Sequence, residues 1–396
     1  MGLENRPHPL VKVPSSITGR SLSKVVVEPV TSKRFQQQFL NLPWQFHKHD
    51  PNWIPPLRGV QRELVNFKPH PFYLNAEVQT YVARRGAEVC GRIAAIDNFG
   101  HNERYSDDRV GFVGFFESID DQQVANGLFL AAQEWFGKRN IRRLRGPTNP
   151  SLNHECGLLI DGFDSPPTFM MTYNPRYYPK LWEVFGFEKT QDLLSFEGDH
   201  KTLANVEEKI YFTYEEAKRR FKLAIRPINK KRFLEDVRIF MDIYNKSLVG
   251  TWGFVPIPDR EIEHTSLALR RLIVPELALI AEIEGKPVGA LFGLLDYNPR
   301  IKEIDGRLLP CGFMRLLGNR RAIKTLRMIS TNVLPEYKVW GLGLFLHVSM
   351  IQPGVAWGLQ TVEYSWVLES NQLSRKTLER AGTKLTKTHR IYDFAW

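Results

Sequence analysis

Apolar positions along the chain divide it into short strands and amphipathic helices in mixed order. Near the start, VVVEPVTSKRFQQQFL reads as a strand, a proline turn and the beginning of a helix. The segment LAIRPINKKRFLEDVR, from Leu223, reads in the same way, with the proline and the Lys-Arg-Phe run in matching places. Such a recurrence indicates an internal repeat.

Two further pairs of segments repeat in the same order. VARRGAEVCGRIAAIDN and AEIEGKPVGALFGLLDY each predict a β-hairpin with a turn glycine. YYPKLWEVFGFEKTQDLLSF and SRKTLERAGTKLTKTHRIYDF each predict a short helix, a glycine cap and a last strand. We therefore expect two copies of one mixed α/β unit, the alternative being two unrelated α+β domains. The boundaries that we expect are an N-terminal arm at 1–20, a first unit at 21–197, a charged connector at 198–222 and a second unit at 223–396.

Composition narrows the class of protein only slightly. A chain of 396 residues is long enough for two domains. Its 54 Lys and Arg against 43 Asp and Glu favour anionic partners, such as phosphorylated cofactors, nucleic acid or anionic lipids. Three cysteines are too few for a disulfide framework or a Cys-rich zinc site. No export signal and no apolar run of roughly 20 residues is found, so we expect a cytoplasmic protein.

The segment NVLPEYKVWGLG joins a predicted strand to the predicted helix GLFLHVSMI. Its glycines, Gly341 and Gly343, let backbone N–H groups approach a ligand closely, and a helix N-terminus favours an anion. The equivalent segment of the first unit, DDQQVANG, has Ala125 in place of the first glycine and two aspartates beside it. We therefore expect the second copy to bind a pyrophosphate and the first copy not to.

These features resemble the GNAT superfamily of acyl-CoA-dependent N-acyltransferases. The strand–loop–helix pattern of that family, Val-x-Pro-x-x-Arg/Gln-x-x-Gly-x-Gly/Ala, is matched by Val333, Pro335, Lys338, Gly341 and Gly343. In that family the loop and helix are followed by a strand, the motif Asn-x-x-Ala/Ser and a further helix. The segment VEYSWVLESNQLSRKTLERAG matches this order. The resemblance implies a mixed α/β (α+β) sheet in two tandem GNAT-like acyltransferase units packed together.

The resemblance also implies roles for individual residues. Acyl-CoA or acetyl-CoA would be the co-substrate, without a metal, and its pantetheine arm would enter where the strand of the loop separates from the next strand. Lys338 keeps the charge of the usual arginine but not its bidentate fork, and Leu378 stands where many members carry the acid, a tyrosine. Pro353 is expected to kink or end the helix after the loop. The implied cofactor-binding residues are Asn332, Val333, Lys338, Val339, Trp340, Gly341, Leu342, Gly343 and Asn371.

An insertion in the first unit, 146–176, gathers polar side chains among turn-forming residues. Loops of this length are often functional, although a structured surface loop fits the pattern equally well. His154 is a candidate general base, because its ordinary pKa of about 6.5 suits proton transfer near neutral pH. Asn153, Glu155 and Tyr173 are candidate substrate contacts. The His-Glu-Cys sequence lacks the spacing of a metal site.

Two other segments have open interpretations. Glu369, at the end of the strand VEYSWVLE, is the candidate carboxylate base, unless it caps the helix that begins near Asn371. The cationic, amphipathic insertion 298–327 is a candidate for binding the 3′-phosphate of CoA or an anionic membrane, or it is a solvated helix that covers the core.

The whole chain also looks like a bacterial group of tandem GNAT-like proteins, the YghO-like group, some relatives of which are implicated as bacterial ceramide synthases. This resemblance implies transfer of an acyl group from CoA to a small-molecule or lipid amine, with a long-chain (sphingoid-type) amine as one candidate. It also implies peripheral contact with the inner face of the membrane and no nucleic-acid partner. The alternatives are a Fem-like transferase that uses aminoacyl-tRNA, and a non-catalytic protein that binds acyl-CoA or lipid.

Overall fold

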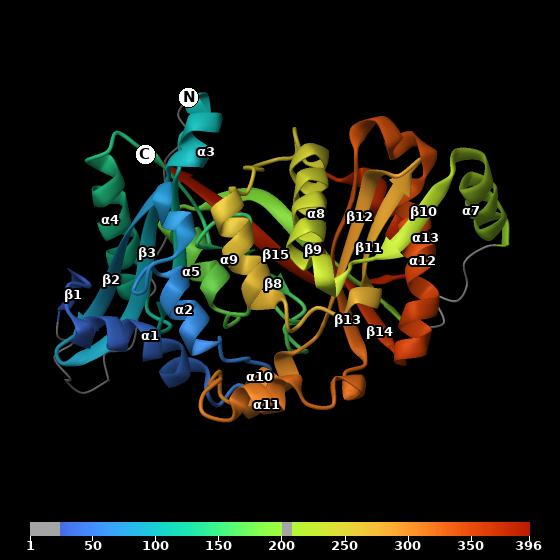
Figure 1. Ribbon diagram of the computed structural model, residues 1–396. Coiled ribbons are helices and arrows are strands. Elements are labelled where there is room, and N and C mark those ends of the chain that lie inside the picture. The colour runs from blue at the N-terminus through green and yellow to red at the C-terminus, as the bar shows by residue number, and fades with distance from the viewer. Residues whose placement is uncertain (1–23, 200–207) are drawn as a thin grey trace, which may run out of the picture.

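The computed structural model describes residues 24–199 and 208–396, so the predicted N-terminal arm, 1–20, lies outside the described residues. Thirteen strands form one continuous sheet through the molecule, with helices on both faces (Figure 1). The strand order is β1-β2-β3-β4-β5-β15-β9-β14-β13-β12-β11-β10, and β8 pairs with β15. Parallel and antiparallel pairs both occur. The mixed α/β fold predicted from the sequence is confirmed.

The first half of the chain forms the left part of Figure 1. Its strands are β1 (Val25–Pro29), β2 (Ala76–Arg85), β3 (Glu88–Asn98), β4 (Gly111–Ser118), β5 (Arg143–Gly146), β6 (Thr148–Asn149), β7 (Glu155–Cys156), β8 (Leu158–Asp161) and β9 (Glu188–Asp199). Its helices are α1 (Lys33–His47), α2 (Arg58–Leu64), α3 (Phe99–Arg104), α4 (Gln122–Gly137) and α5 (Tyr178–Phe185). Neighbouring residues of β3 face opposite sides of the sheet, since Ile93 packs in the cluster with α4 and Ala94 in the cluster with α1.

The second half begins with the connector helix α7 (Glu208–Phe221). Its strands are β10 (Leu223–Pro227), β11 (Ala278–Ile283), β12 (Lys286–Leu295), β13 (Thr325–Val333), β14 (Thr361–Leu368) and β15 (Lys384–Ala395). Its helices are α8 (Phe233–Ser247), α9 (Asp259–Leu269), α10 (Asn298–Glu303), α11 (Gly312–Leu317), α12 (Leu342–Trp357) and α13 (Gln372–Arg380). Short 3-10 helices are η1 (Pro71–Leu74), η2 (Ser106–Asp108), η3 (Lys230–Arg232), η4 (Pro275–Leu277), η5 (Arg320–Ala322) and η6 (Pro335–Trp340).

The repeated segments form matching elements in the two halves. The turn glycines of the hairpins β2–β3 and β11–β12, Gly86 and Gly285, have φ values of 63° and 78°. Gly186 and Gly382 follow α5 and α13 and also have positive φ, the conformation that ends a helix with a left-handed cap. The expectation that Pro353 kinks or ends the helix after the loop was wrong in part, because α12 does not end at Pro353 but continues to Trp357.

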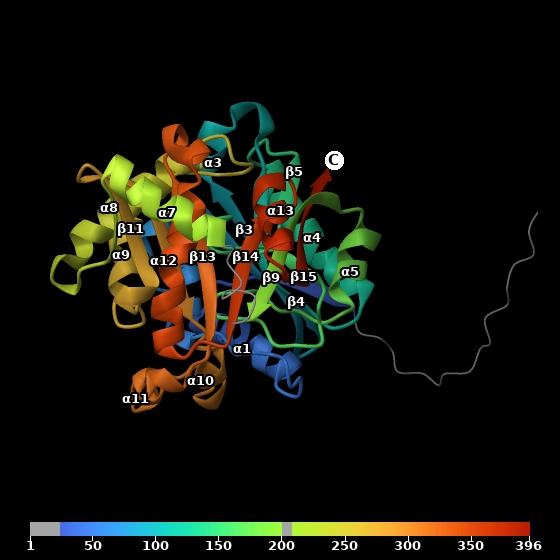
Figure 2. The same ribbon diagram turned by 90° about the vertical axis from the view of Figure 1, so that its right-hand side faces the viewer.

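The last strands of the two units are exchanged within the sheet. β15, which ends the second unit in sequence, pairs with β5 of the first unit. β9, which ends the first unit in sequence, pairs with β14 of the second unit. The two exchanged strands pair with each other at the centre of the sheet, where Figure 2 shows them side by side. The two units therefore share one sheet, and their adjoining faces lie close enough to contribute to a common site.

Candidate functional site

The parallel strands β13 and β14 separate part of the way along their length. Their pairing ends with Met328 opposite Tyr364. Beyond that point β13 stays with β12 up to Val333, whereas β14 stays with β9 up to Leu368. Figure 2 shows the two strands together below and apart above. The stretch over which β13 and β14 are no longer paired is named the β13–β14 gap.

Peptide groups along β13 face the β13–β14 gap. On the opposite edge of the strand, the N–H of Leu334 donates to the carbonyl of Val288 at 2.9 Å. Hydrogen-bonding directions alternate along an antiparallel strand, so the N–H and C=O groups of Thr331 and Val333 point toward the gap. An extended ligand with amide groups of its own can bond to such an edge.

The loop between β13 and α12 presents N–H groups at the wide end of the gap. Gly341 has a φ of 72°, which glycine adopts without strain. The N–H of Leu344 donates to the carbonyl of Gly341, so the N–H groups of Leu342 and Gly343 precede the first intrahelical bond. With the positive end of the 16-residue helix α12, these groups suit a phosphate or a pyrophosphate.

The other predicted residues of this loop differ in their surroundings. Val339 is 89% exposed. The ring of Trp340 lies 4.4 Å from the ring of Phe221, at the end of α7, so the connector packs against the loop. The ammonium of Lys338 donates to the carbonyl of Ser247, at the end of α8, at 3.0 Å. The charge of Lys338 therefore lies near the loop but is tied to the C-terminus of α8.

Asn332 and Asn371 make contacts within the protein. Asn332 is buried, accepts a hydrogen bond from the Ser247 hydroxyl at 3.1 Å and donates to Ser330 at 2.9 Å. It thereby fixes β13 against α8. Asn371 is exposed and caps α13 by accepting from the N–H of Ser374 at 3.1 Å. Both asparagines position elements that border the gap.

A buried arginine stands where β13 and β14 separate. Arg327 is 3% exposed, and its Nε donates to the hydroxyl of Ser365, the first residue of β14 beyond the paired part. Its guanidinium also donates to the carbonyls of Phe169 and Met170, in the insertion of the first unit, at 2.8 and 2.9 Å. Burial lowers the pKa of Arg327, and the charge of Glu363 opposes this effect. The insertion is thus bound to the narrow end of the gap.

Glu155 lies within electrostatic reach of this arginine. Burial raises the pKa of Glu155 to about 7, and the charge of Arg327 works against that rise. Among residues 24–199 and 208–396, none donates a hydrogen bond to its carboxylate. The neighbouring Cys156 packs with Trp366 and Leu368, on the separated end of β14. Glu155 is therefore a carboxylate that no hydrogen-bond donor of the described residues holds. It gains or loses its charge near neutral pH, and it lies next to the apolar side chains that surround Cys156.

The remaining predicted residues of the insertion hold it in place. The imidazole of His154 bonds to the Ser151 hydroxyl at 2.8 Å and lies 3.5 Å from Glu261. Burial, and then His70, lower the pKa of His154 to about 3. Asn153 donates to a backbone carbonyl of the second unit, and Tyr173 donates to the carboxylate of Asp50 at 2.7 Å. Of the four candidates in the insertion, only Glu155 retains an unpaired ionisable group.

Glu369 lies beside β9, where both of its oxygens are engaged. One oxygen accepts from the N–H of Asp192 at 3.0 Å, and the other pairs with Lys189 at 2.7 Å. It does not cap α13, which is capped by Asn371. A carboxylate held by two donors is a poor proton acceptor. The geometry therefore favours Glu155 over Glu369 as a base.

The equivalent gap of the first unit is filled by the chain itself. β4 and β5 also separate, since their pairing ends with Phe112 opposite Arg145. Here, however, the side chain of Asn149 accepts from the N–H of Phe115 at 2.6 Å. A Cβ on Gly114 would lie 1.5 Å from the carbonyl oxygen of Thr148, so the backbone of β6 leaves no space.

The helix start beside that first gap also has its own anion. Asp121 caps α4 by accepting from the N–H of Gln123 at 2.9 Å. Its carboxylate also pairs with Arg85 at 2.8 Å. A phosphate at this helix terminus would have to displace a carboxylate that is already bound there. Both features support a single binding site for a phosphorylated ligand, in the second unit.

Two polar residues beside the β13–β14 gap were missed in the sequence. Arg327 was assigned to a cationic insertion, whereas it lies inside β13. His347 lies one helical turn after Gly343, and its Nε2 is 3.0 Å from the hydroxyl of Thr331. Burial lowers the pKa of His347 to about 4, so its ring is neutral at neutral pH. The spacing of four between Gly343 and His347 was a signal that both face β13.

Within the part of the chain that the structure describes, no group of three His, Cys, Asp or Glu side chains could hold a metal ion. In the same residues, no helix combines the length and the apolar character needed to cross a membrane.

Two curated proteins are similar to this chain over nearly its whole length. Protein YghO of Escherichia coli is 32% identical over 376 residues, which cover 93% of this chain and 95% of YghO. The bacterial ceramide synthase of Caulobacter vibrioides is 31% identical and covers 97% of this chain and 100% of its own. Among solved structures, a tandem GNAT protein from the clavulanic acid biosynthesis pathway superposes with a TM-score of 0.56 at 12% identity, covering 94% of this chain and 98% of that one. No protein-family model matches the chain.

Proposed function

The chain belongs to the family of YghO and the bacterial ceramide synthase and has the tandem GNAT fold, and on this premise we propose that it is an N-acyltransferase that uses acyl-CoA. The observation that carries the proposal is the β13–β14 gap. It combines an edge of available peptide groups on β13 with a glycine loop and an uncapped helix start at its wide end. One extended ligand with a pyrophosphate at one end fits both features.

The residues of the second unit would hold the acyl-CoA substrate. The N–H groups of Leu342 and Gly343, at the start of α12, would bind the pyrophosphate. The peptide groups of Thr331 and Val333 would bond to the amides of the pantetheine arm. The thioester would then reach the narrow end of the gap, near Arg327 and Glu155.

Glu155 would supply the base. The lone pair of the amine attacks the thioester carbon, a C–N bond forms, and the C–S bond breaks with its electron pair leaving on sulfur. Glu155 takes the proton that the amine nitrogen loses, and the thiolate takes up a proton as it departs. Leu378, half-buried in the core, has no proton to give. The proton that Glu155 has taken from the amine would pass to the thiolate, directly or through a solvent water, so the transfer leaves no net charge.

The acceptor that fits the surroundings is an amine with a hydrocarbon portion. The cluster beside Glu155 contains Leu152, Trp252, Trp366 and Leu368, which present apolar surface. A relative with 31% identity is named a bacterial ceramide synthase, which supports a long-chain amine. Burying a hydrocarbon chain there contributes about 0.8 kcal/mol per CH₂ group. We therefore propose a long-chain amine in preference to a small polar one.

Product analysis tests this function. The purified chain is incubated with short- and long-chain acyl-CoA and a panel of amines that includes long-chain amines, and the amide is identified by mass spectrometry. We expect free CoA and one amide in equal amounts. Binding of acyl-CoA without turnover of any amine would instead favour a non-catalytic lipid-binding protein. Transfer from aminoacyl-tRNA, without use of acyl-CoA, would favour a Fem-like transferase.

Replacing Gly341 with alanine is expected to weaken acyl-CoA binding about fivefold to tenfold. Alanine at a φ of 72° costs roughly 1 kcal/mol, and the loop relieves this strain by moving its N–H groups. Isothermal titration with CoA measures the change. Gly285→Ala is the matched control, because Gly285 has a φ of 78° and a Cβ would meet no atom within 4 Å at either glycine. If both variants bind CoA like the original chain, the loop does not hold the pyrophosphate.

A further inference from the structure

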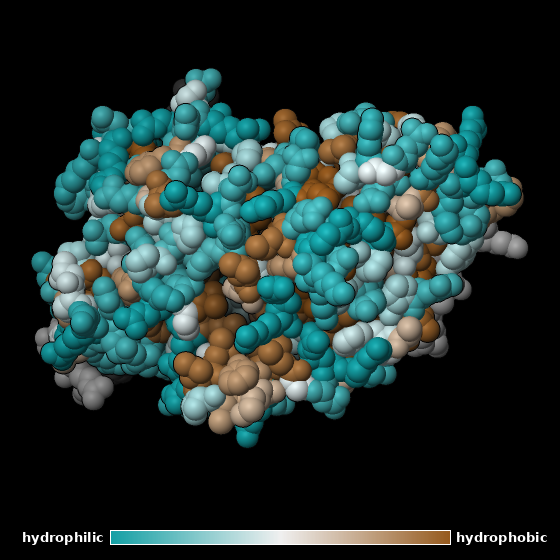
Figure 3. Space-filling model, in the orientation of Figure 1, coloured by the Kyte–Doolittle hydropathy of each residue, from teal (hydrophilic) through white to brown (hydrophobic). Residues whose placement is uncertain are grey.

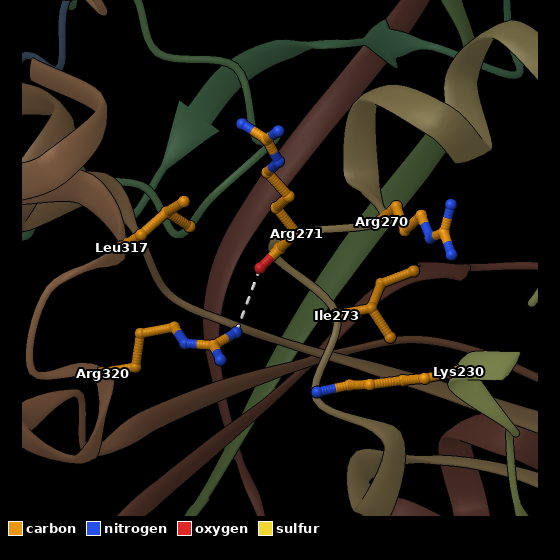
Figure 4. Close-up of a pocket in the computed structure, with 6 residues that line it drawn as sticks. All are labelled: Lys230, Arg270, Arg271, Ile273, Leu317 and Arg320. Carbon is orange, nitrogen blue, oxygen red and sulfur yellow. Dashed lines mark hydrogen bonds between the residues drawn. The ribbon is translucent and has the colours of Figure 1, made fainter.

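A second cationic feature lies away from the β13–β14 gap, in an open hollow. Figure 4 shows its lining side chains, which come from η3, the segment after α9, the end of α11 and η5. Four of the six are cations and none is acidic. The lining residues are Lys230, Arg270, Arg271, Ile273, Leu317 and Arg320.

The charges of this hollow are not neutralised by the protein. Within the described ranges, none of the four cations forms an ion pair. Arg320 donates to the backbone carbonyl of Arg271 at 3.0 Å, the bond drawn in Figure 4, which fixes the Arg320 guanidinium against the segment after α9, while the Arg271 guanidinium points away from it. Cations that line one concave surface attract anions.

Exposed apolar side chains border the hollow. Phe313 and Leu317 are four residues apart on α11 and so share one side of that helix, and Leu317 lines the hollow. Leu309 is 80% exposed, Met314 55% and Phe313 41%. Figure 3 shows apolar surface gathered at the lower edge of the molecule, over the region of α10 and α11. Such a group at the surface of a protein marks an interaction site.

The segment that carries these apolar residues is firmly held. The guanidinium of Arg300, on α10, donates to the carbonyls of Arg315 and Leu316 at 3.1 and 3.3 Å and to that of Asn319 at 2.8 Å. These bonds satisfy carbonyl groups at the end of α11 and in the turn that follows. The hydrogen bonds of Arg300 therefore fix the position of the segment that carries the exposed apolar residues, next to the cations.

We propose that this surface docks the protein onto an anionic phospholipid bilayer. The hollow receives the phosphate of a lipid headgroup, and Leu309, Phe313 and Met314 enter the boundary between headgroups and acyl chains. Charge complementarity identifies the anion, and the exposed apolar residues select a lipid over a dissolved phosphate, which would gain nothing from them. This docking requires neither CoA nor an amine, so it goes beyond the proposed acyl transfer.

Vesicle sedimentation of the full chain tests the docking. We expect binding to vesicles of phosphatidylglycerol and much weaker binding to phosphatidylcholine. The double variant Arg270→Gln/Arg271→Gln is expected to lower the affinity about 25-fold, roughly fivefold for each cation. Met314→Asp is expected to lower it at least tenfold. The matched control is Arg104→Gln/Arg109→Gln, with the same loss of charge near α3, at the opposite edge of the molecule (Figure 1).

Four outcomes would overturn the proposal. The first two are equal binding to both kinds of vesicle, and a loss of affinity in the control variant as large as in Arg270→Gln/Arg271→Gln. The other two are an unchanged affinity of Met314→Asp, and full displacement of the protein from the vesicles by inorganic phosphate at a concentration equal to that of the lipid phosphate. The last two would identify the hollow as a site for a soluble phosphate compound. Amide formation from soluble short-chain substrates is expected to be unchanged in all of these variants, which separates a failure of docking from a failure of the proposed function.

Discussion

Replacing Glu155 with glutamine is expected to lower kcat for amide formation by about 10²- to 10⁴-fold, the usual contribution of a general base. Burial raises the pKa of Glu155 to about 7, so its carboxyl is protonated below that pH and cannot accept a proton. In the original chain, kcat at saturating acyl-CoA and amine should therefore fall about tenfold per pH unit below pH 7. Glutamine does not titrate, so this acid limb should be absent from the residual rate of the variant. Steady-state rates of CoA release across about pH 5 to 9 measure both effects.

Glu261→Gln is the matched control for this experiment. Burial raises the pKa of Glu261 to about 7 as well, but Glu261 lies beside His154, away from Arg327. Its replacement is expected to leave the rate and the acid limb unchanged. If Glu155→Gln retained the full rate and Glu369→Gln lost it, the base would be Glu369, as the sequence alone suggested.

Replacing Arg327 with methionine is expected to destabilise the fold by about 3–5 kcal/mol, the usual cost of leaving a buried charge uncompensated. The change removes the positive charge beside Glu363, which is also only 3% exposed. It also leaves the carbonyls of Phe169 and Met170 without the donor that binds the insertion to β13. Urea unfolding followed by circular dichroism measures the loss.

Arg176→Met provides the comparison, because Arg176 and its partner Asp164 are 67% and 93% exposed as side chains. An exposed pair contributes only about 0–1 kcal/mol, so this variant should unfold at nearly the same urea concentration as the original chain. A similarly small effect of Arg327→Met would mean that the insertion is not held at the gap by this arginine.

Local motifs made several features predictable from the sequence. Gly86, Gly285, Gly186 and Gly382 were predicted in turns and caps, where positive φ requires glycine or penalises other residues. The mixed α/β fold followed from the repeated order of strands and helices, because each element is encoded by its own hydrophobic period. The family resemblance predicted that β13 separates from β14. The structure agrees, because the two strands stop pairing after Met328 and Tyr364.

Contacts between distant segments were not predictable in the same way. The exchange of β9 and β15 has no local signal, because a strand with a given pattern can pair in either half of the sheet. Arg327 was read as part of a surface segment, since its partners Phe169 and Met170 come from the other half of the chain. Regular alternation of side chains along β14 does not hold past Tyr364, because the pairing with β9 shifts between Tyr364 and Val367. Lys189, which engages Glu369, was not foreseen either.

The structure of the protein crystallised with CoA is the measurement that tests the central claim most directly. The proposal predicts one CoA per chain, with its pyrophosphate against the N–H groups of Leu342 and Gly343, its arm along Thr331 and Val333, and its sulfur on the side of Glu155. CoA between β4 and β5, or a sulfur atom directed away from Glu155, would contradict a site built from the second unit together with the insertion of the first.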